Sequence, residues 1–147
     1  MNIFVLDQDP VRAASFQCDK HIVQMIRETA QLLATAHRVL DGKKDGKIWV
    51  LESELDSKIP QATHFNHPCA VWVRQSADNY RWLVEHFGAL LHVYALRYSK
   101  IHFYDQFLEP LAAYPYAIKS GWLTEWPKCM PDEYKKDTVI ESYRNIY

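Results

Sequence analysis

Two clusters of side chains in this 147-residue chain combine groups that could do chemistry. The first is Cys18-Asp19-Lys20-His21, which is followed seven residues after the histidine by Glu28. It combines an imidazole, which transfers protons near neutral pH, with an ammonium group that can hold an anion. Seven residues span about 10.5 Å of helix, so His21 and Glu28 would face one side and bracket a ligand, with Gln24 between them.

These residues also have ordinary structural explanations. Lys20 suits a solvated surface, His21 suits a hydrogen bond to a backbone carbonyl, and Glu28 suits an ion pair. Cys18 falls on the apolar stripe of the expected helix, which predicts a buried and unreactive thiol. Because the groups occur together, we predict that His21 and Glu28 are catalytic and that Lys20 and Gln24 bind the substrate.

The second cluster, Asn66-His67-Pro68-Cys69, precedes another long helical pattern. The start of a helix attracts anions and can lower the pKa of a cysteine, which makes Cys69 the best candidate nucleophile among the cysteines. The alternative for Cys69 is a small buried residue beneath Trp72. Asn66 would cap the helix or contact the amide edge of a base. We predict catalytic roles for Cys69 and His67 and a substrate contact for Asn66.

Three residues farther along the same pattern are predicted to bind substrate: Arg74, Asn79 and Tyr80. Arg74 and Arg81 are seven residues apart on one helix side, where they would neutralise phosphates or solubilise the surface. Asn79 and Tyr80 place an amide beside an aromatic ring, which is also ordinary helix packing.

We predict neither a metal nor a cofactor. His64 and His67 have the spacing of metal ligands, but with Cys69 they still complete no set of four. The chain has no glycine-rich phosphate loop and no HExxH or GxSxG motif. These absences disfavour nucleotide hydrolysis and serine hydrolase chemistry.

Helices are expected to position both clusters, in an all-α single domain over residues 1–147. Asp9 and Pro10 predict the start of a helix that runs to about residue 40, breaks near Cys18 and ends at Gly42. Its apolar stripe leaves Arg38 on the wet face. Pro68 begins a second helical stretch that reaches about residue 99 and restarts near Ser76.

The remaining segments are shorter. Residues 3–6 read as a strand or an extended segment, and residues 41–47 as a solvated turn. A third helix is expected over residues 102–113, a loop over 116–136, and a last helix over 138–146 that Asp137 would cap.

Composition excludes some classes of function. Seventeen basic and eighteen acidic residues give a net charge of −1, which argues against a general duplex-binding surface. Three cysteines without a CxxC motif, and no signal peptide, predict a reduced protein of the cytoplasm. The apolar N-terminus stops at Asp7 and is too short to span a membrane.

Several short motifs together give the chain a family resemblance. These motifs are Phe4-Val5-Leu6-Asp7-x-Asp9-Pro10, Cys18-Asp19-Lys20-His21, Asn66-His67-Pro68-Cys69-x-x-Trp72-Val73-Arg74, Asn79-Tyr80-x-Trp82-Leu83, Met130-Pro131-Asp132-Glu133-Tyr134 and Tyr143-Arg144-Asn145. Over nearly its whole length the chain resembles a family of small bacteriophage proteins. The resemblance implies a host-cytoplasmic protein linked to modification of DNA bases, in particular transfer of amino-bearing groups to thymine derivatives. It also implies a C-terminal wall that continues beyond Tyr147.

The leading hypothesis is therefore an enzyme that modifies a pyrimidine base, in DNA or as a nucleotide, as a group transferase. Lys20 and Arg74 would stabilise a leaving anion, His21 or Glu28 would deprotonate an incoming amine, and Cys69 would add to the ring. Two alternatives remain. One is a helical binding protein that acts on a host protein or a nucleotide, and the other is a single-stranded nucleic-acid binder that stacks bases on its aromatic residues.

Overall fold

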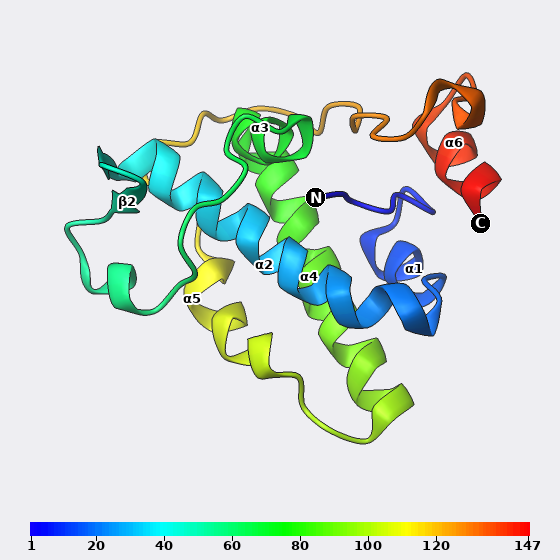
Figure 1. The fold of residues 1–147 in the computed structure, drawn as a ribbon, viewed down its shortest axis with the longest axis horizontal. Coiled ribbons are helices and arrows are strands. Elements are labelled where there is room, and N and C mark those ends of the chain that lie inside the picture. Colours follow the sequence, from blue (N-terminus) through cyan, green and yellow to red (C-terminus); the bar gives the residue numbers. More distant parts are fainter.

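A computed structural model describes residues 1–147 as one mainly helical domain, which confirms the predicted all-α class. Six α-helices and three short 3₁₀ helices surround a core, and a two-stranded hairpin is the only sheet (Figure 1). None of the helices combines the length and the apolar character needed to cross a membrane. The elements are α1 (Pro10–Ser15), α2 (Asp19–Asp41), β1 (Lys43–Asp45), β2 (Ile48–Val50), η1 (Glu54–Ser57), α3 (Pro68–Gln75), α4 (Ala77–Tyr98), η2 (Phe103–Phe107), α5 (Leu108–Ala112), η3 (Asp132–Tyr134) and α6 (Val139–Ile146).

The first long helix is broken where the sequence predicts, which gives α1 and α2. Asp9 caps α1 by accepting from the backbone N–H of Val11 and of Arg12, and Gly42 follows the last turn of α2. Cys18 occupies the position before α2 and is exposed, so the prediction of a buried thiol was wrong. The break takes Cys18 out of helical register, and the apolar stripe of α2 begins only at Ile22.

The second helical stretch also divides, into α3 and α4, and Ser76 caps α4 by accepting from the N–H of Asn79. The residue before α3 is His67, whose Nδ1 accepts from the N–H of Cys69. The prediction that Asn66 caps this helix was therefore wrong by one residue. Pro68 fills the first helical position, so the cap must be the residue directly before it.

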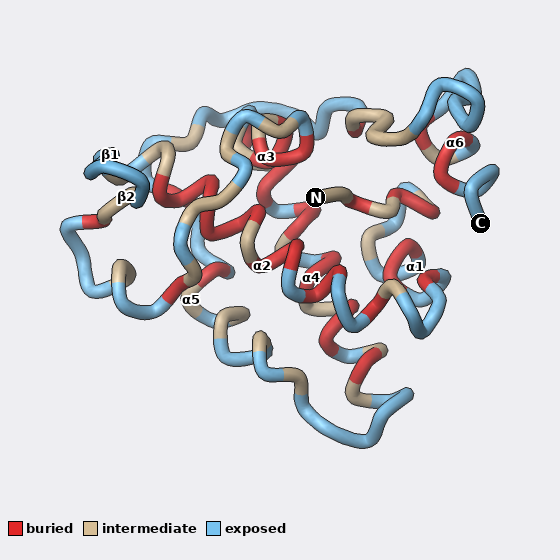
Figure 2. Tube along the Cα trace, in the orientation of Figure 1, coloured by how far each residue is buried: buried red, intermediate tan, exposed pale blue.

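Helix α4 forms the centre of the core. It contacts α1, α2, α3 and α5, and the buried stretches of α2, α3 and α4 face one another (Figure 2). The largest fully buried side chains come from α2, α4, α5 and α6 and from the extended N-terminal segment, residues 1–6, which lacks strand pairing. Ile3, Val5 and Leu6 of that segment are buried, so the start of the chain is built into the core.

The predicted solvated turn at residues 41–47 is largely exposed, as expected, and it contains the first strand and the turn of a hairpin. Lys43 pairs with Val50 and Asp45 with Ile48, and Gly46 takes the positive φ of 63° that this tight connection requires. The following segment, residues 49–60, folds over Arg38, which is only 2% exposed. The prediction that Arg38 lies on the wet face was wrong, because its guanidinium donates to carbonyl groups of that segment.

The C-terminal part lies beside the N-terminal segment. The expected third helix is a 3₁₀ helix followed by the short α5, and residues 116–136 are mainly loop, as predicted. Thr138, and not Asp137, caps α6, because its hydroxyl oxygen accepts from the N–H of Glu141. Tyr143 of α6 donates to Asn2 Oδ1 at 2.7 Å, and α6 lies beside the N-terminal segment (Figure 1).

Candidate functional site

A cavity of about 350 Å³ opens along α2, where the N-terminal segment crosses the helix. Four residues that the sequence analysis assigned to the site line this cavity, and all four come from the first three turns of α2. They are Lys20, His21, Gln24 and Glu28. Residues of the N-terminal segment form the other wall. The lining residues are Met1, Asn2, Phe4, Lys20, His21, Gln24, Met25 and Glu28.

The N-terminal amine lies in this cavity and pairs with Glu28. The α-amino nitrogen of Met1 is 3.0 Å from Glu28 Oε1, and Gln24 donates to Glu28 Oε2 at 2.8 Å. Glu28 is only 7% exposed, so its carboxylate is largely removed from water. Each of its two oxygens has a donor, which offsets the cost of this burial. An amine beside a carboxylate can attack an electrophilic carbon and give up its protons locally.

The sequence-based prediction considered side chains only and therefore missed this amine. The available signal was the apolar run of residues 3–6, which predicts that the start of the chain is held against the core. A buried first strand or segment fixes the position of the terminal amine, which would otherwise move with a flexible tail.

His21 contributes an aromatic wall as well as a titratable group. Its ring stacks on Phe4 with centroids 4.6 Å apart, and its Nδ1 forms a hydrogen bond with the hydroxyl of Tyr147. Phe4 also meets the edges of Tyr143 and Tyr147. One side of the cavity is therefore a planar aromatic group next to the amine.

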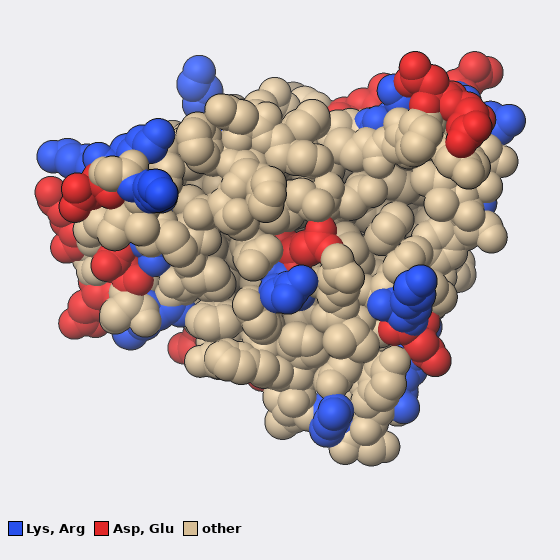
Figure 3. Space-filling view, viewed as in Figure 1, with Lys and Arg blue, Asp and Glu red and all other residues tan.

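A second cavity of about 430 Å³ adjoins the first and shares Lys20 and Gln24 with it. Arg27 and His102 also line it, and burial is the main cause that lowers the pKa of His102. Lys20 and Arg27 are both exposed cations on α2. Figure 3 shows that charged side chains gather mainly toward the ends of this face, with a small basic and acidic group over α2, so the molecule has local cations in place of a broad basic surface.

The second cluster, at the start of α3, lines neither of these two cavities. Cys69 is fully buried, and its sulfur is 3.4 Å from that of Cys129. This hydrogen bond is the largest cause of two opposite shifts, since it lowers the pKa of Cys129 to about 7 and raises the pKa of Cys69. Cys129, which the sequence did not single out, is the less buried thiol of this pair.

Four residues that the sequence analysis predicted to bind substrate line neither cavity on α2, and three of them make structural hydrogen bonds. Arg74 donates to the carbonyls of Phe65 and Ala70 and so holds the loop before α3. Asn79 and Tyr80 are fully buried: Asn79 bonds Thr124 and the carbonyl of Trp72, whereas Tyr80 donates to the carbonyl of Leu111. Asn66 is exposed on the loop and lines neither of the two cavities on α2.

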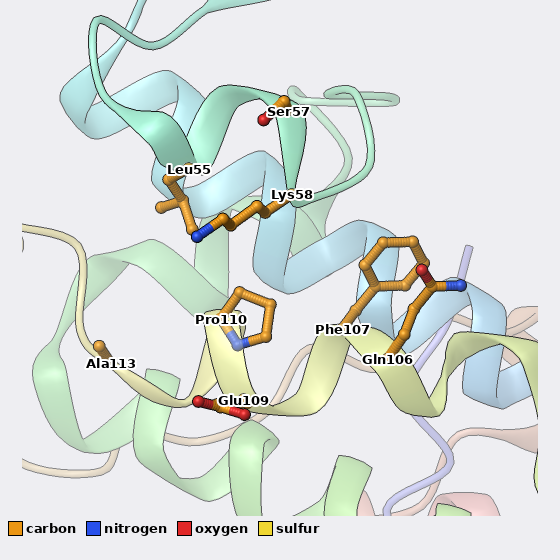
Figure 4. Close-up of a pocket in the computed structure, with 8 residues that line it drawn as sticks. All are labelled: Leu55, Ser57, Lys58, Gln106, Phe107, Glu109, Pro110 and Ala113. Carbon is orange, nitrogen blue, oxygen red and sulfur yellow. The ribbon is translucent and has the colours of Figure 1, made fainter.

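A larger cavity, of about 610 Å³, lies elsewhere, between η1 and the η2–α5 segment (Figure 4). Lys58 and Glu109 are its charged lining residues, and Leu55, Phe107 and Pro110 provide apolar walls. It contains no residue of either cluster and no arrangement of a nucleophile with a base. Size alone therefore does not select it, and the smaller cavity at Met1 and Glu28 remains the candidate site.

Comparison with known families gives one match. The family model for pyrimidine dimer DNA glycosylase matches residues 1–106, which include the N-terminal segment, the residues of α2 that line both cavities, and the whole second cluster. Neither the curated proteins nor the solved structures yield a match to this chain.

Proposed function

Because the chain belongs to the pyrimidine dimer DNA glycosylase family, we propose that it breaks the bond between a damaged pyrimidine and its deoxyribose. A DNA substrate with pyrimidine bases follows from the family, and the residues that act on it are part of the proposal. One observation carries the assignment. The α-amine of Met1 lies 3.0 Å from the buried carboxylate of Glu28 at the wall of a cavity.

The proposed reaction is nucleophilic displacement at the sugar. The unprotonated amine of Met1 attacks C1′ of the nucleotide, the C1′–N1 bond breaks, and the base leaves with the bonding electron pair. The new C1′–N bond leaves a positive charge on the nitrogen, and Glu28 accepts one proton from it. Glu28 then returns this proton to O4′ as the sugar ring opens, which leaves a protonated imine between the protein and the DNA.

The imine allows a second step on the DNA strand. Glu28, again a carboxylate, removes a proton from C2′, and the 3′-phosphate leaves with the electron pair of its C–O bond. The strand is cut, and hydrolysis of the remaining imine regenerates the amine. Glu28 thus acts as base, acid and base in turn, and Gln24 orients it through the hydrogen bond to Oε2.

The surroundings of the amine suit a single nucleotide. A volume of about 350 Å³ is too small for a duplex, so DNA must present a nucleotide turned out of its stack. The stacked pair of Phe4 and His21 offers a flat surface to a base. Lys20 and Arg27, which line the adjoining cavity from the same helix, would bind the flanking phosphates.

The test uses a duplex with one cyclobutane pyrimidine dimer and protein whose N-terminus is verified by intact mass. Borohydride, which reduces an imine to a stable amine, is expected to link the protein covalently to the DNA. Peptide mapping should place the link at Met1. Acetylation of the α-amine should remove both the link and base release, and Glu28→Gln should lower the rate by about 10²-fold or more.

Glu85→Gln is the matched control, because Glu85 is exposed on α4 and pairs only with Arg81. This variant should keep full activity. If acetylated protein releases the base at the normal rate, the amine is not the nucleophile. If the dimer-containing DNA keeps its glycosidic bonds but a modified thymine gains mass, the protein is a group transferase, as the resemblance to phage proteins implies.

A further inference from the structure

The thiol of Cys69, from the second cluster, lies in a group with His67 and Cys129 whose chemistry the proposed reaction does not use. One ring nitrogen of His67 and the sulfur atoms of Cys69 and Cys129 all lie within 4.8 Å of one another. His67 and Cys69 come from the start of α3, and Cys129 comes from the loop that precedes η3, sixty residues away in the chain. The fold thus assembles three donor atoms from two separate segments.

We propose that His67, Cys69 and Cys129 bind a zinc ion, with a water molecule as the fourth ligand. Two thiolates and one imidazole are a donor set that zinc favours over harder cations such as magnesium or calcium. The proposed site is distinct from the cavity at Met1 and Glu28, which none of these three residues lines.

The separation of the two sulfurs suits a tetrahedral ion, and the ring nitrogen of His67, which lies within 4.8 Å of the sulfurs, would move closer to bind it. With bonds of about 2.3 Å to sulfur, tetrahedral geometry places two ligand sulfurs about 3.7 Å apart. The two sulfurs are 3.4 Å apart, so they need only separate by a few tenths of an ångström. A disulfide needs about 2.05 Å and would require a far larger approach of the α3 start to the loop.

His67 must change its role when a metal binds. Its Nδ1 now accepts from the N–H of Cys69 as the cap of α3, and neutral imidazole has only one lone pair to offer. The metal therefore competes with the cap for His67, and binding loosens the first turn of α3 while it joins α3 to the loop. Asparagine at this position would keep the cap and remove the metal ligand.

The site would stabilise the part of the molecule that holds the N-terminal segment. Asn2 donates to the carbonyl of Cys129 at 3.2 Å, and the N–H of Cys129 donates to the hydroxyl of Tyr143. A zinc ion that fixes Cys129 therefore fixes the anchor of Asn2 as well. Ligand binding to the folded state alone raises the free energy of unfolding, which gives a readout independent of activity.

The experiment begins with full-length protein, purified under reducing conditions and stripped of metal. Addition of Co²⁺ alone should produce a sulfur-to-cobalt charge-transfer band, and Zn²⁺ should bleach it at one equivalent per chain. Zn²⁺ should also raise the melting temperature. Cys129→Ser and His67→Asn should weaken metal binding strongly and lose this rise in melting temperature.

Cys18→Ser and His64→Asn are the matched controls, because both residues are exposed and lie outside the group of three. They should bind cobalt as the parent protein does. If folded, reduced parent protein gives no cobalt band, or if Cys129→Ser and His67→Asn retain it unchanged, the proposal is overturned. Formation of a Cys69–Cys129 disulfide by a thiol oxidant, without any metal binding, would also overturn it.

Discussion

His86 is a buried base whose neutral form the fold requires. It lies on α4, its Nδ1 donates to the carbonyl of Pro10 at 2.9 Å, and its ring stacks on Trp82. Its Nε2 faces the amide of Gln17 at 3.4 Å, which fits a neutral ring that donates through Nδ1 and accepts through Nε2. Burial, the largest cause, lowers the pKa of His86 to about 4.

We predict that the free energy of unfolding decreases on acidification because of His86. In the unfolded chain a histidine titrates near pH 6.5, so between pH 6.5 and about 4 the unfolded state binds more protons than the folded state. The contribution is fully present above pH 6.5 and decreases below it, by up to about 3 kcal/mol near pH 4. Urea unfolding at several pH values measures this loss.

The replacement His86→Gln should flatten the pH dependence in this window, although it also lowers stability at neutral pH. His92→Gln, at an exposed position of the same helix, is the control and should leave the slope as in the parent protein. An unchanged slope in His86→Gln would show that other groups cause the loss of stability in acid.

Helix α2 and the hairpin that follows it are joined through one side chain. Arg38 makes five hydrogen bonds to residues 49–60, including a charge-assisted bond of 2.6 Å to Asp56 Oδ1. Asp56 in turn accepts from the N–H of Leu51, and these bonds lower its pKa, that from Leu51 most of all. The segment has few buried apolar residues of its own, so Arg38 substitutes for a core beneath it.

Arg38→Ala should therefore destabilise the protein by about 3 kcal/mol, because it leaves the carbonyls of residues 49–60 that accept from Arg38 without their donor, whereas Asp56 keeps its bond from Leu51. Arg38→Lys should recover only part of this, because lysine has three donors and cannot reproduce the planar fork. Urea unfolding of both variants measures the difference. Arg81→Ala, at an exposed position of α4, should change stability by less than about 0.5 kcal/mol.

The helices could be predicted from the sequence because their signals are local. Asp9, Ser76 and Gly42 mark helix ends within a few residues of the groups that they contact, and the apolar spacing marks the inner face. Arg38 was misplaced because its partners lie 11 to 22 residues away and reach it only after the hairpin forms. The spacing of apolar residues along a helix cannot show that a distant segment, here residues 49–60, will cover one of its polar side chains.

The candidate site was predicted in part, for the same physical reason. His21, Gln24 and Glu28 share a side of one helix, and helical geometry alone places them along one cavity. The amine of Met1 and the thiol of Cys129 join their partners through the fold, across 27 and 60 residues respectively. No spacing rule connects residues that meet only through tertiary packing.

The charge of the whole molecule limits how it holds DNA. The net charge of −1 supplies little general attraction to a polyanion, so binding must rest on a few local cations. Lys20 and Arg27 beside the two cavities are the candidates. The molecule should thus bind undamaged duplex weakly and depend on the extruded nucleotide for affinity.

With two phosphate contacts, the logarithm of the association constant should fall with the logarithm of salt concentration with a slope of about −2. Lys20→Gln should make the slope less negative by about 0.9, since one counterion fewer is released. Fluorescence anisotropy with dimer-containing DNA at several KCl concentrations measures both values. Lys47→Gln in the hairpin turn is the control, and an equal change there would show a diffuse electrostatic effect.

The meeting of both chain ends at the cavity has a practical consequence for protein production. The α-amine of Met1 lies in the cavity, and the hydroxyl of Tyr147 is bonded to His21, which lines it. An affinity tag at the N-terminus would convert the α-amine into a peptide bond. A tag at the C-terminus would lie close to the aromatic wall of the cavity. The exposed hairpin turn at Gly46 and Lys47 contacts neither cavity on α2, so an internal tag there should give material that can be purified and still react.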